Sequence, residues 1–242
     1  MSSPRPANAS QDSPGYLVKF ETYQVGNDSY HIRSLLDRQQ YSDPDGEAEQ
    51  LGISSATWPL FGMMWPSGLE LAKQVEEMPL AGKRILEIGC GLALASLVAH
   101  RRGADITASD IHPLAETFLL ENIALNQMRP LPYAHEDWAG PDSELGGFDL
   151  IIGSDLLYER DQPGCLSRFI DAHSAPKVEI IIIDPDRGHR ARFNREMAGY
   201  GYSHRETRLQ SAATLAIPAY KGRTLNYTRD TTSKLSPRHS TT

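Results

Sequence analysis

Two short clusters of residues could do chemistry, and the first is a glycine loop. Gly89 and Gly91 follow a short apolar run and precede a stretch rich in alanine and leucine. A glycine loop between a strand and a helix is the context of a nucleotide-binding loop. Gly89 permits the tight turn, and Gly91 lets a ligand approach bare backbone. The sequence therefore predicts a ligand site at this loop.

The residues around the loop indicate which ligand it suits. Asp110 stands nineteen positions after Gly91, where a carboxylate can accept hydrogen bonds from ribose hydroxyls. A dinucleotide loop needs its third glycine at position 94, but Leu94 stands there and only the small Ala93 lies beside it. Glu87 would repel a pyrophosphate and suits a cationic amino group. These features favour S-adenosylmethionine (SAM) over a nicotinamide cofactor, with a purely structural glycine turn as the alternative.

The second cluster is Asp155 with Tyr158, directly after a predicted strand over 148–153. Ligands of open α/β sheets bind beyond the carboxyl ends of the strands, so this cluster is expected to border the same site. The loop 184–189 follows the next predicted strand and reaches the same edge. Within it Arg187 could bind an acidic group, and His189 could act as a base or simply lie at the surface.

The elements that position these residues alternate between strand and helix from residue 83 onward. This alternation predicts an α/β fold with a doubly wound, mostly parallel, seven-stranded Rossmann-like sheet. A terminal antiparallel strand pair is expected because no long helix separates its two strands. The predicted strands cover 84–88, 106–109, 132–135, 148–153, 178–184, 202–208 and 223–229, and the helices cover 92–100, 113–126, 161–173 and 190–200.

The residues before the core follow a different sequence pattern. Residues 16–36 alternate around Gly26-Asn27-Asp28, which predicts a β-hairpin, and residues 38–57 are polar and rich in turn formers. Ser67 is placed to N-cap a following helix. We therefore divide the chain into a disordered tail (1–14), an N-terminal hairpin and helix extension packed on the core (15–82), the core (83–229) and a second disordered tail (230–242).

The core resembles the class I, seven-strand SAM-dependent methyltransferases through Glu87, Gly89 and Gly91, with Ala93 in place of their last glycine. Over about residues 16–229 it resembles more specifically the protein-lysine-methyltransferase-like family, methyltransferase family 16. Four motifs in order carry this resemblance: Trp65-Pro66-Ser67-Gly68, Glu87-Ile88-Gly89-Cys90-Gly91, Asp137-Trp138 and Gly153-Ser154-Asp155-Leu156-Leu157-Tyr158.

The resemblance implies a cofactor-binding role for each matching residue. Trp65 would lie against the cofactor near the pocket mouth, and the loop Gly89-Cys90-Gly91 would face the methionine part. Asp110 would hold the ribose hydroxyls, and Ser154 would lie beside the sulfonium. Trp138 would lie against adenine, with Asp137 nearby. Without the resemblance, both tryptophans would be assigned to core packing.

Asp155 and Tyr158 are the predicted catalytic residues. Methyl transfer from a sulfonium needs a neutral nucleophile aligned about 3 Å from the methyl carbon, away from water. A lysine amine, with a pKa of about 10.4, must first lose its proton. Asp155 can orient that amine and Tyr158 can offer its aromatic face or hydroxyl. A carboxylate beside the amine also raises the amine's pKa, which opposes catalysis. Local capping and packing roles are the alternative for both residues.

Composition limits the remaining function classes. The chain carries 24 Lys and Arg against 31 Asp and Glu, a net charge of −7, which argues against broad nucleic-acid binding. Two cysteines and scattered histidines show no metal-ligand spacing, so no metal is predicted. No apolar run is long enough for a membrane span, and we expect a cytoplasmic monomer acting on a protein. A small-molecule N- or O-methyltransferase and a non-catalytic SAM-binding module remain the alternatives.

Overall fold

The computed structural model describes residues 15–39, 41–43, 45–140, 143–158, 162–213 and 219–232. The predicted tail 1–14 and most of the predicted tail 230–242 lie outside these residues. The helices are α1 (Glu47–Gln50), α2 (Pro66–Glu77), α3 (Leu94–Arg101), α4 (Ala115–Leu125), α5 (Gln162–Ala172) and α6 (Arg190–Gly199), with a 3-10 helix over Trp58–Gly62.

A seven-stranded sheet forms the centre of the described structure, and it confirms the predicted fold class. Its strands lie in the order β5-β4-β3-β6-β7-β9-β8. β9 runs antiparallel to both β7 and β8, and the other neighbours are parallel. The strands are β3 (Arg84–Ile88), β4 (Asp105–Asp110), β5 (Tyr133–His135), β6 (Phe148–Ser154), β7 (Ser174–Asp184), β8 (Ser203–Ser211) and β9 (Tyr220–Asp230).

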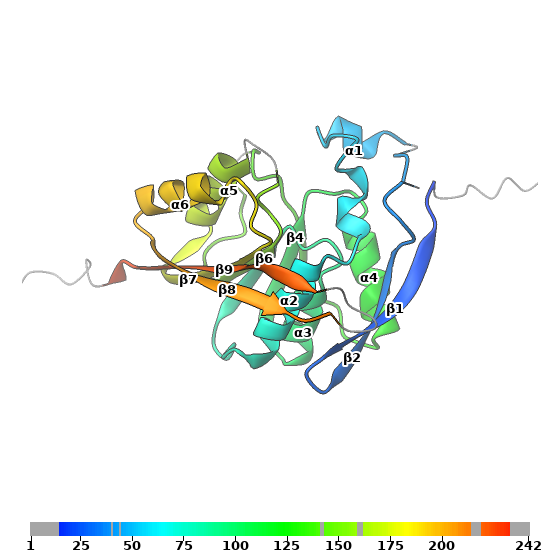
Figure 1. Cartoon of the computed structure of the whole chain (residues 1–242), viewed down its shortest axis with the longest axis horizontal. Helices are drawn as coiled ribbons and strands as arrows, with labels where there is room; N and C mark the ends of the chain where they lie inside the picture. Colours follow the sequence, from blue (N-terminus) through cyan, green and yellow to red (C-terminus); the bar gives the residue numbers. More distant parts are fainter. Residues whose placement is uncertain are drawn as a thin grey trace, which may run out of the picture.

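The central strands are buried on both faces because successive side chains point to opposite sides of the sheet. Ile181 and Ile183 of β7 pack into one apolar cluster with side chains of α2, α3 and α4. Ile180 and Ile182 pack into a second cluster with side chains of α5 and α6. The helices therefore cover the sheet from both sides, in two groups (Figure 1).

The predicted hairpin is present as β1 (Val18–Val25) and β2 (Asp28–Leu35), a separate antiparallel pair beside α4 (Figure 1). Asn122 of α4 and Asn126, the C-cap residue of this helix, lie one helical turn apart, so their amides face the same way. Their Oδ1 atoms accept the backbone N–H groups of Arg33 and His31 at 2.7 and 2.8 Å. The helix thus supplies side-chain partners to the backbone of β2.

The segment between hairpin and core contains one difference from expectation. α2 begins at Pro66 with Trp65 as its N-cap residue, and no side chain caps it. The predicted capping role of Ser67 is therefore wrong. Its buried hydroxyl instead lies 3.0 Å from the Tyr220 hydroxyl of β9, which joins the start of α2 to the sheet.

Candidate active site

A cavity of about 850 Å³ lies where β3, β4 and β6 reach their carboxyl ends. The strand order reverses between β3 and β6, which is the usual ligand position in an open α/β sheet. The structure brings all eleven predicted site residues together in the cavity wall: Trp65, Glu87, Gly89, Cys90, Gly91, Asp110, Asp137, Trp138, Ser154, Asp155 and Tyr158.

The glycine loop needs its glycines for backbone shape and for space. Gly89 and Gly91 have φ of +58° and +52°, in the left-handed region that favours glycine. A Cβ on Gly91 would lie 2.8 Å from the carbonyl oxygen of Phe61. A Cβ on Gly89 would lie 2.7 Å from Leu156 Cδ2 and 3.3 Å from the Trp138 ring. The loop is therefore packed tightly between the 3-10 helix and the residues after β5 and β6.

Asp110 ends β4 and holds the glycine loop from the neighbouring strand. Its Oδ2 accepts the Gly91 N–H at 2.8 Å, and its Oδ1 accepts the His112 N–H at 2.9 Å. Burial raises the pKa of Asp110, and these backbone hydrogen bonds oppose that rise. The Ile111 N–H also bonds to this carboxylate, which has about four lone-pair sites and so keeps capacity for a further donor.

Glu87 is buried at the end of β3, and its main partner is a residue that the sequence did not reveal. Its Oε2 accepts hydrogen bonds from both the backbone N–H, at 2.8 Å, and the hydroxyl of Ser96 in the first turn of α3. Burial raises the pKa of Glu87 to about 7, despite these bonds. Glu87 was predicted to suit a cationic group. Its carboxylate already interacts with the N-terminus of α3, so only part of its hydrogen-bonding capacity is left for such a group.

Asp155 takes a conformation unusual for a residue with a side chain, with φ of +53° directly after β6. Its backbone N–H donates to the Ile183 carbonyl at 2.8 Å. Its two carboxylate oxygens accept from Arg187 Nε at 2.8 Å and Nη2 at 3.1 Å. The sequence placed both residues at this edge without predicting this two-pronged ion pair. Tyr158 follows at the rim, 38% exposed.

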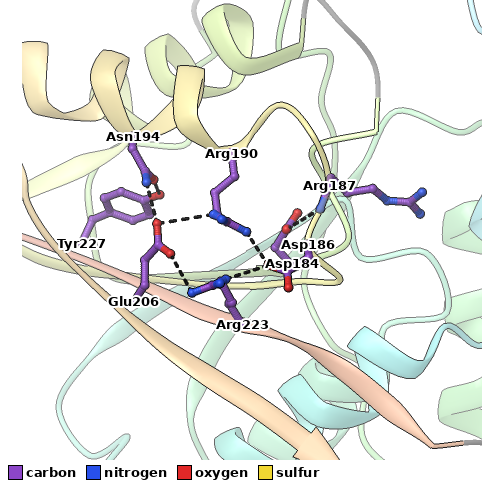
Figure 2. A network of polar contacts seen from close by, with 8 residues as sticks. All are labelled: Asp184, Asp186, Arg187, Arg190, Asn194, Glu206, Arg223 and Tyr227. Carbon is purple, nitrogen blue, oxygen red and sulfur yellow. Dashed lines mark hydrogen bonds and ion pairs between the residues drawn. The ribbon is translucent and has the colours of Figure 1, made fainter.

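The loop after β7 is anchored by Asp184, which is completely buried. Asp184 Oδ1 accepts the Arg187 backbone N–H at 2.8 Å, while Oδ2 is buried without a hydrogen-bond partner. Burial raises the pKa of Asp184 to about 6. Figure 2 shows this contact beside a network of charged side chains from α6, β8 and β9.

Residues between 51 and 65 form much of the cavity wall, and of these only Trp65 was predicted to be a site residue. Phe61 stacks on His112 with 3.6 Å between ring centroids, and both line the cavity. Burial lowers the pKa of His112 to about 3, so this ring is neutral.

The two predicted cofactor tryptophans are both half-buried in the wall. Trp65 donates its indole N–H to the Leu60 carbonyl at 2.9 Å, and the Arg38 guanidinium lies 5.8 Å from its ring centre. Trp138 packs beside Gly89 and the cluster around α5. Asp137 is exposed and accepts the Ala139 N–H at 2.8 Å in a local turn. Each tryptophan ring therefore has a structural contact and also lines the cavity.

The described residues contain no group of three or more His, Cys, Asp or Glu side chains arranged to hold a metal ion. Within the same ranges, no helix is both long and apolar enough to cross a membrane.

Comparison with known proteins gives consistent matches. A family model described as lysine methyltransferase matches residues 50–196, more than half of the chain. The chain is 31% identical over 133 residues to the electron transfer flavoprotein beta subunit lysine methyltransferase of Danio rerio, covering 53% of this chain and 51% of that protein. It is 26% identical to the protein N-terminal and lysine N-methyltransferase EFM7 of Yarrowia lipolytica, covering 86% of each.

Solved structures share the fold. The chain superposes on the T. thermophilus 16S rRNA N2 G1207 methyltransferase with a TM-score of 0.60 at 14% identity, covering 88% of this chain and 51% of that one. The chain spans about half the length of the electron transfer flavoprotein beta subunit lysine methyltransferases that it matches.

Proposed function

The chain belongs to the lysine methyltransferase family, and from that membership we propose that it transfers a methyl group from SAM to a lysine side chain of a protein. One observation carries the proposal. A single cavity is lined both by the glycine loop, which suits the cofactor, and by Asp155 and Tyr158, which suit an acceptor amine. A binding module would need only the first of these two sets.

The residues present fit SAM. Gly89 and Gly91 line the cavity without side chains, and Asp110 keeps acceptor capacity for ribose hydroxyls. The Trp138 ring supplies an aromatic surface for adenine. Glu87 lines the same cavity, and a cationic ammonium nearby favours its ionised form, which burial alone disfavours. We assign these residues to cofactor binding, together with Trp65, Cys90, Asp137 and Ser154.

The chemistry divides between cofactor and protein. SAM, when bound, supplies an activated methyl group, whose transfer leaves the S–C electron pair on sulfur. Asp155 orients the acceptor by accepting an N–H of the amine, and Tyr158 presents its ring at the entrance. Apolar wall residues such as Met63, Met64 and Leu156 disfavour a charged ammonium, so the amine releases its proton to solvent before attack.

The test is labelled methyl transfer from SAM into a heat-treated lysate that keeps its small molecules and whose own methyltransferases are inactive. A labelled protein band with the wild type, absent with Asp155→Ala and retained with Asp105→Ala, supports the proposal. Asp105 is an exposed carboxylate at the start of β4, far from the carboxyl ends of the strands. Label confined to the small-molecule fraction would identify a small-molecule methyltransferase. Confirmed SAM binding without any label would identify a binding module.

We further propose that residues 83–229 form the catalytic core, that 15–82 form an extension of it, and that the protein acts as a cytoplasmic monomer. The shared apolar cluster of the hairpin, α2 and the core supports the first part. The cysteine count favours a reducing compartment. Light scattering of the purified protein tests the monomer directly.

A further inference from the structure

The Asp155–Arg187 ion pair places a cation where the acceptor amine is expected. The carboxylate side chain is only 10% exposed, while the Arg187 side chain is 42% exposed. The Asp155 carboxylate is thus largely shielded from solvent, and the Arg187 guanidinium that contacts it is more exposed. Both residues line the cavity. The pair as a whole is close to neutral, which matters because a free carboxylate here would hold an acceptor lysine in its protonated form.

The backbone beneath Arg187 is fixed by contacts on both sides. Asp184 accepts the Arg187 N–H at 2.8 Å. Asp186, at φ of +65°, accepts from Arg223 Nε at 2.6 Å and from Arg190 Nη1.

Glu206 of β8 closes this arrangement into a ring. It lies 3.4 Å from Arg190 Nε and 3.3 Å from Arg223 Nη1. Figure 2 shows this ring of four charged side chains, with the Arg187 side chain pointing away from it. The ring therefore holds the loop and leaves the Arg187 guanidinium available to Asp155.

We propose that Arg187 is a positioning residue that keeps Asp155 electrically compensated, so that the acceptor amine enters without being held as an ammonium. The inference rests on the proposed function. A negative charge within about 4–6 Å of an amine favours the protonated form and raises the pKa of the amine by about 1–3. A guanidinium stays charged at every accessible pH and cancels most of this effect. Asp155 keeps lone pairs to accept an N–H of the neutral amine.

Other titratable groups face this pair and determine the pH range of the test. Asp184 of the loop and Tyr158 of the turn after β6 interact with Arg187, and Tyr220 of β9 interacts with Asp155. Asp186 of the loop and Arg190 of α6 act on Asp184. Asp184, with a pKa raised to about 6, is ionised above pH 7. Burial raises the pKa of Tyr220 to about 12, so Tyr220 stays neutral up to pH 9.5. Tyr158 is unchanged in every variant compared, so its contribution is the same in all the pH profiles.

The experiment measures the initial rate of labelled methyl incorporation into the heat-treated lysate between pH 7 and 9.5, with saturating SAM. The initial rate of Arg187→Gln should be about tenfold below that of the wild type at pH 7.5. The rising limb of its pH–rate profile should move to higher pH by about one pH unit or more. Arg187→Lys keeps the charge and should keep the limb near its wild-type position. Arg192→Gln removes a nearby arginine that pairs with Glu196 and should match the wild type. Calorimetry should give unchanged S-adenosylhomocysteine affinity for all three.

The possible failures are distinct. A uniform loss at every pH with an unmoved limb, or a wild-type profile for Arg187→Gln, overturns this inference and leaves the proposed function intact. A limb moved by a full unit in Arg187→Lys also overturns it, because the charge is still present. A wild-type protein that labels no protein at any pH overturns the proposed function and this inference with it. Melting temperatures exclude unfolding as the cause of any loss.

Discussion

The Asp110 carboxylate accepts the backbone N–H of Gly91 at 2.8 Å, so the end of β4 holds the loop that follows its neighbour β3. The two strands are parallel and paired, which brings their carboxyl ends together. The same carboxylate accepts the N–H of His112. One side chain therefore sets the shape of two chain segments that line the cavity.

Asp110→Asn should weaken both folding and cofactor binding. An amide can accept at only one of its two ends, so one of the two buried N–H groups would face an NH₂ group. We expect a loss of about 1–3 kcal/mol in the free energy of unfolding and at least about tenfold weaker S-adenosylhomocysteine binding. Urea denaturation and calorimetry measure these effects. Asp105→Asn, on the same strand but exposed, should change neither. Equal behaviour of the two variants would contradict the role of Asp110.

Gly91→Ala tests whether the glycine loop needs space as well as backbone freedom. The matched control is Gly103→Ala, because Gly103 has φ of +78° and nothing within 4 Å of an added Cβ. The control should lose about 1–2 kcal/mol from left-handed strain alone. Gly91→Ala should lose about 1–3 kcal/mol more, since its Cβ meets the Phe61 carbonyl at 2.8 Å. Its cofactor affinity should also fall, while that of the control stays unchanged.

Glu87→Gln should change how stability depends on pH. Burial raises the folded-state pKa of Glu87 from 4.5 to about 7. Between these values the folded state keeps a proton that the unfolded chain releases, so wild-type stability falls as pH rises through this window and levels off above it. The variant lacks this contribution. The difference between its free energy of unfolding and that of the wild type should therefore rise by at most about 3 kcal/mol in favour of the variant between pH 4.5 and 7.

Urea denaturation at several pH values measures that difference. Glu116→Gln, in the exposed first turn of α4, should show the same pH slope as the wild type. A constant offset between Glu87→Gln and the wild type across the window would show that Glu87 does not titrate there.

Local patterns were enough to predict the sheet, whereas Trp65 and Trp138 of the cavity wall were assigned to cofactor binding only through the family resemblance. The apolar run of β7 and the glycine loop are local signals, and strand order then gathers their ends at one edge. The Asp155–Arg187 pair was not predictable, because it joins residues 32 positions apart through the stagger of β6 and β7. The Glu87–Ser96 contact likewise depends on how α3 is seated against β3.

The backbone conformation at Ala93 is another feature that was not predicted from the sequence. The sequence shows that a small residue, alanine, replaces the last glycine of the motif. The structure shows that Ala93 also has φ of +57°, so the position requires a left-handed backbone as well as a small side chain. Size can be judged from the sequence, whereas the backbone angle at one residue cannot.

The attachment of the hairpin to α4 gives the last prediction, which separates folding from cofactor binding. Asn126 Nδ2 donates to the His31 carbonyl and to the Asn122 carbonyl, both at 2.7 Å. Asn126→Ala removes these bonds and should cost about 1–3 kcal/mol of stability. Asn126→Asp should cost more at neutral pH, because its carboxylate would face two carbonyl oxygens without a proton to donate. Among the described residues the hairpin does not line the cavity, so both variants should bind S-adenosylhomocysteine with wild-type affinity while they remain folded. Denaturation at pH 5 and pH 8 should show the aspartate variant recovering part of its loss at the lower pH, where the buried carboxyl gains a proton that it can donate. An aspartate variant at least as stable as the alanine variant at pH 8 would contradict the donor role of Asn126, and weakened binding in folded protein would make the hairpin part of the site.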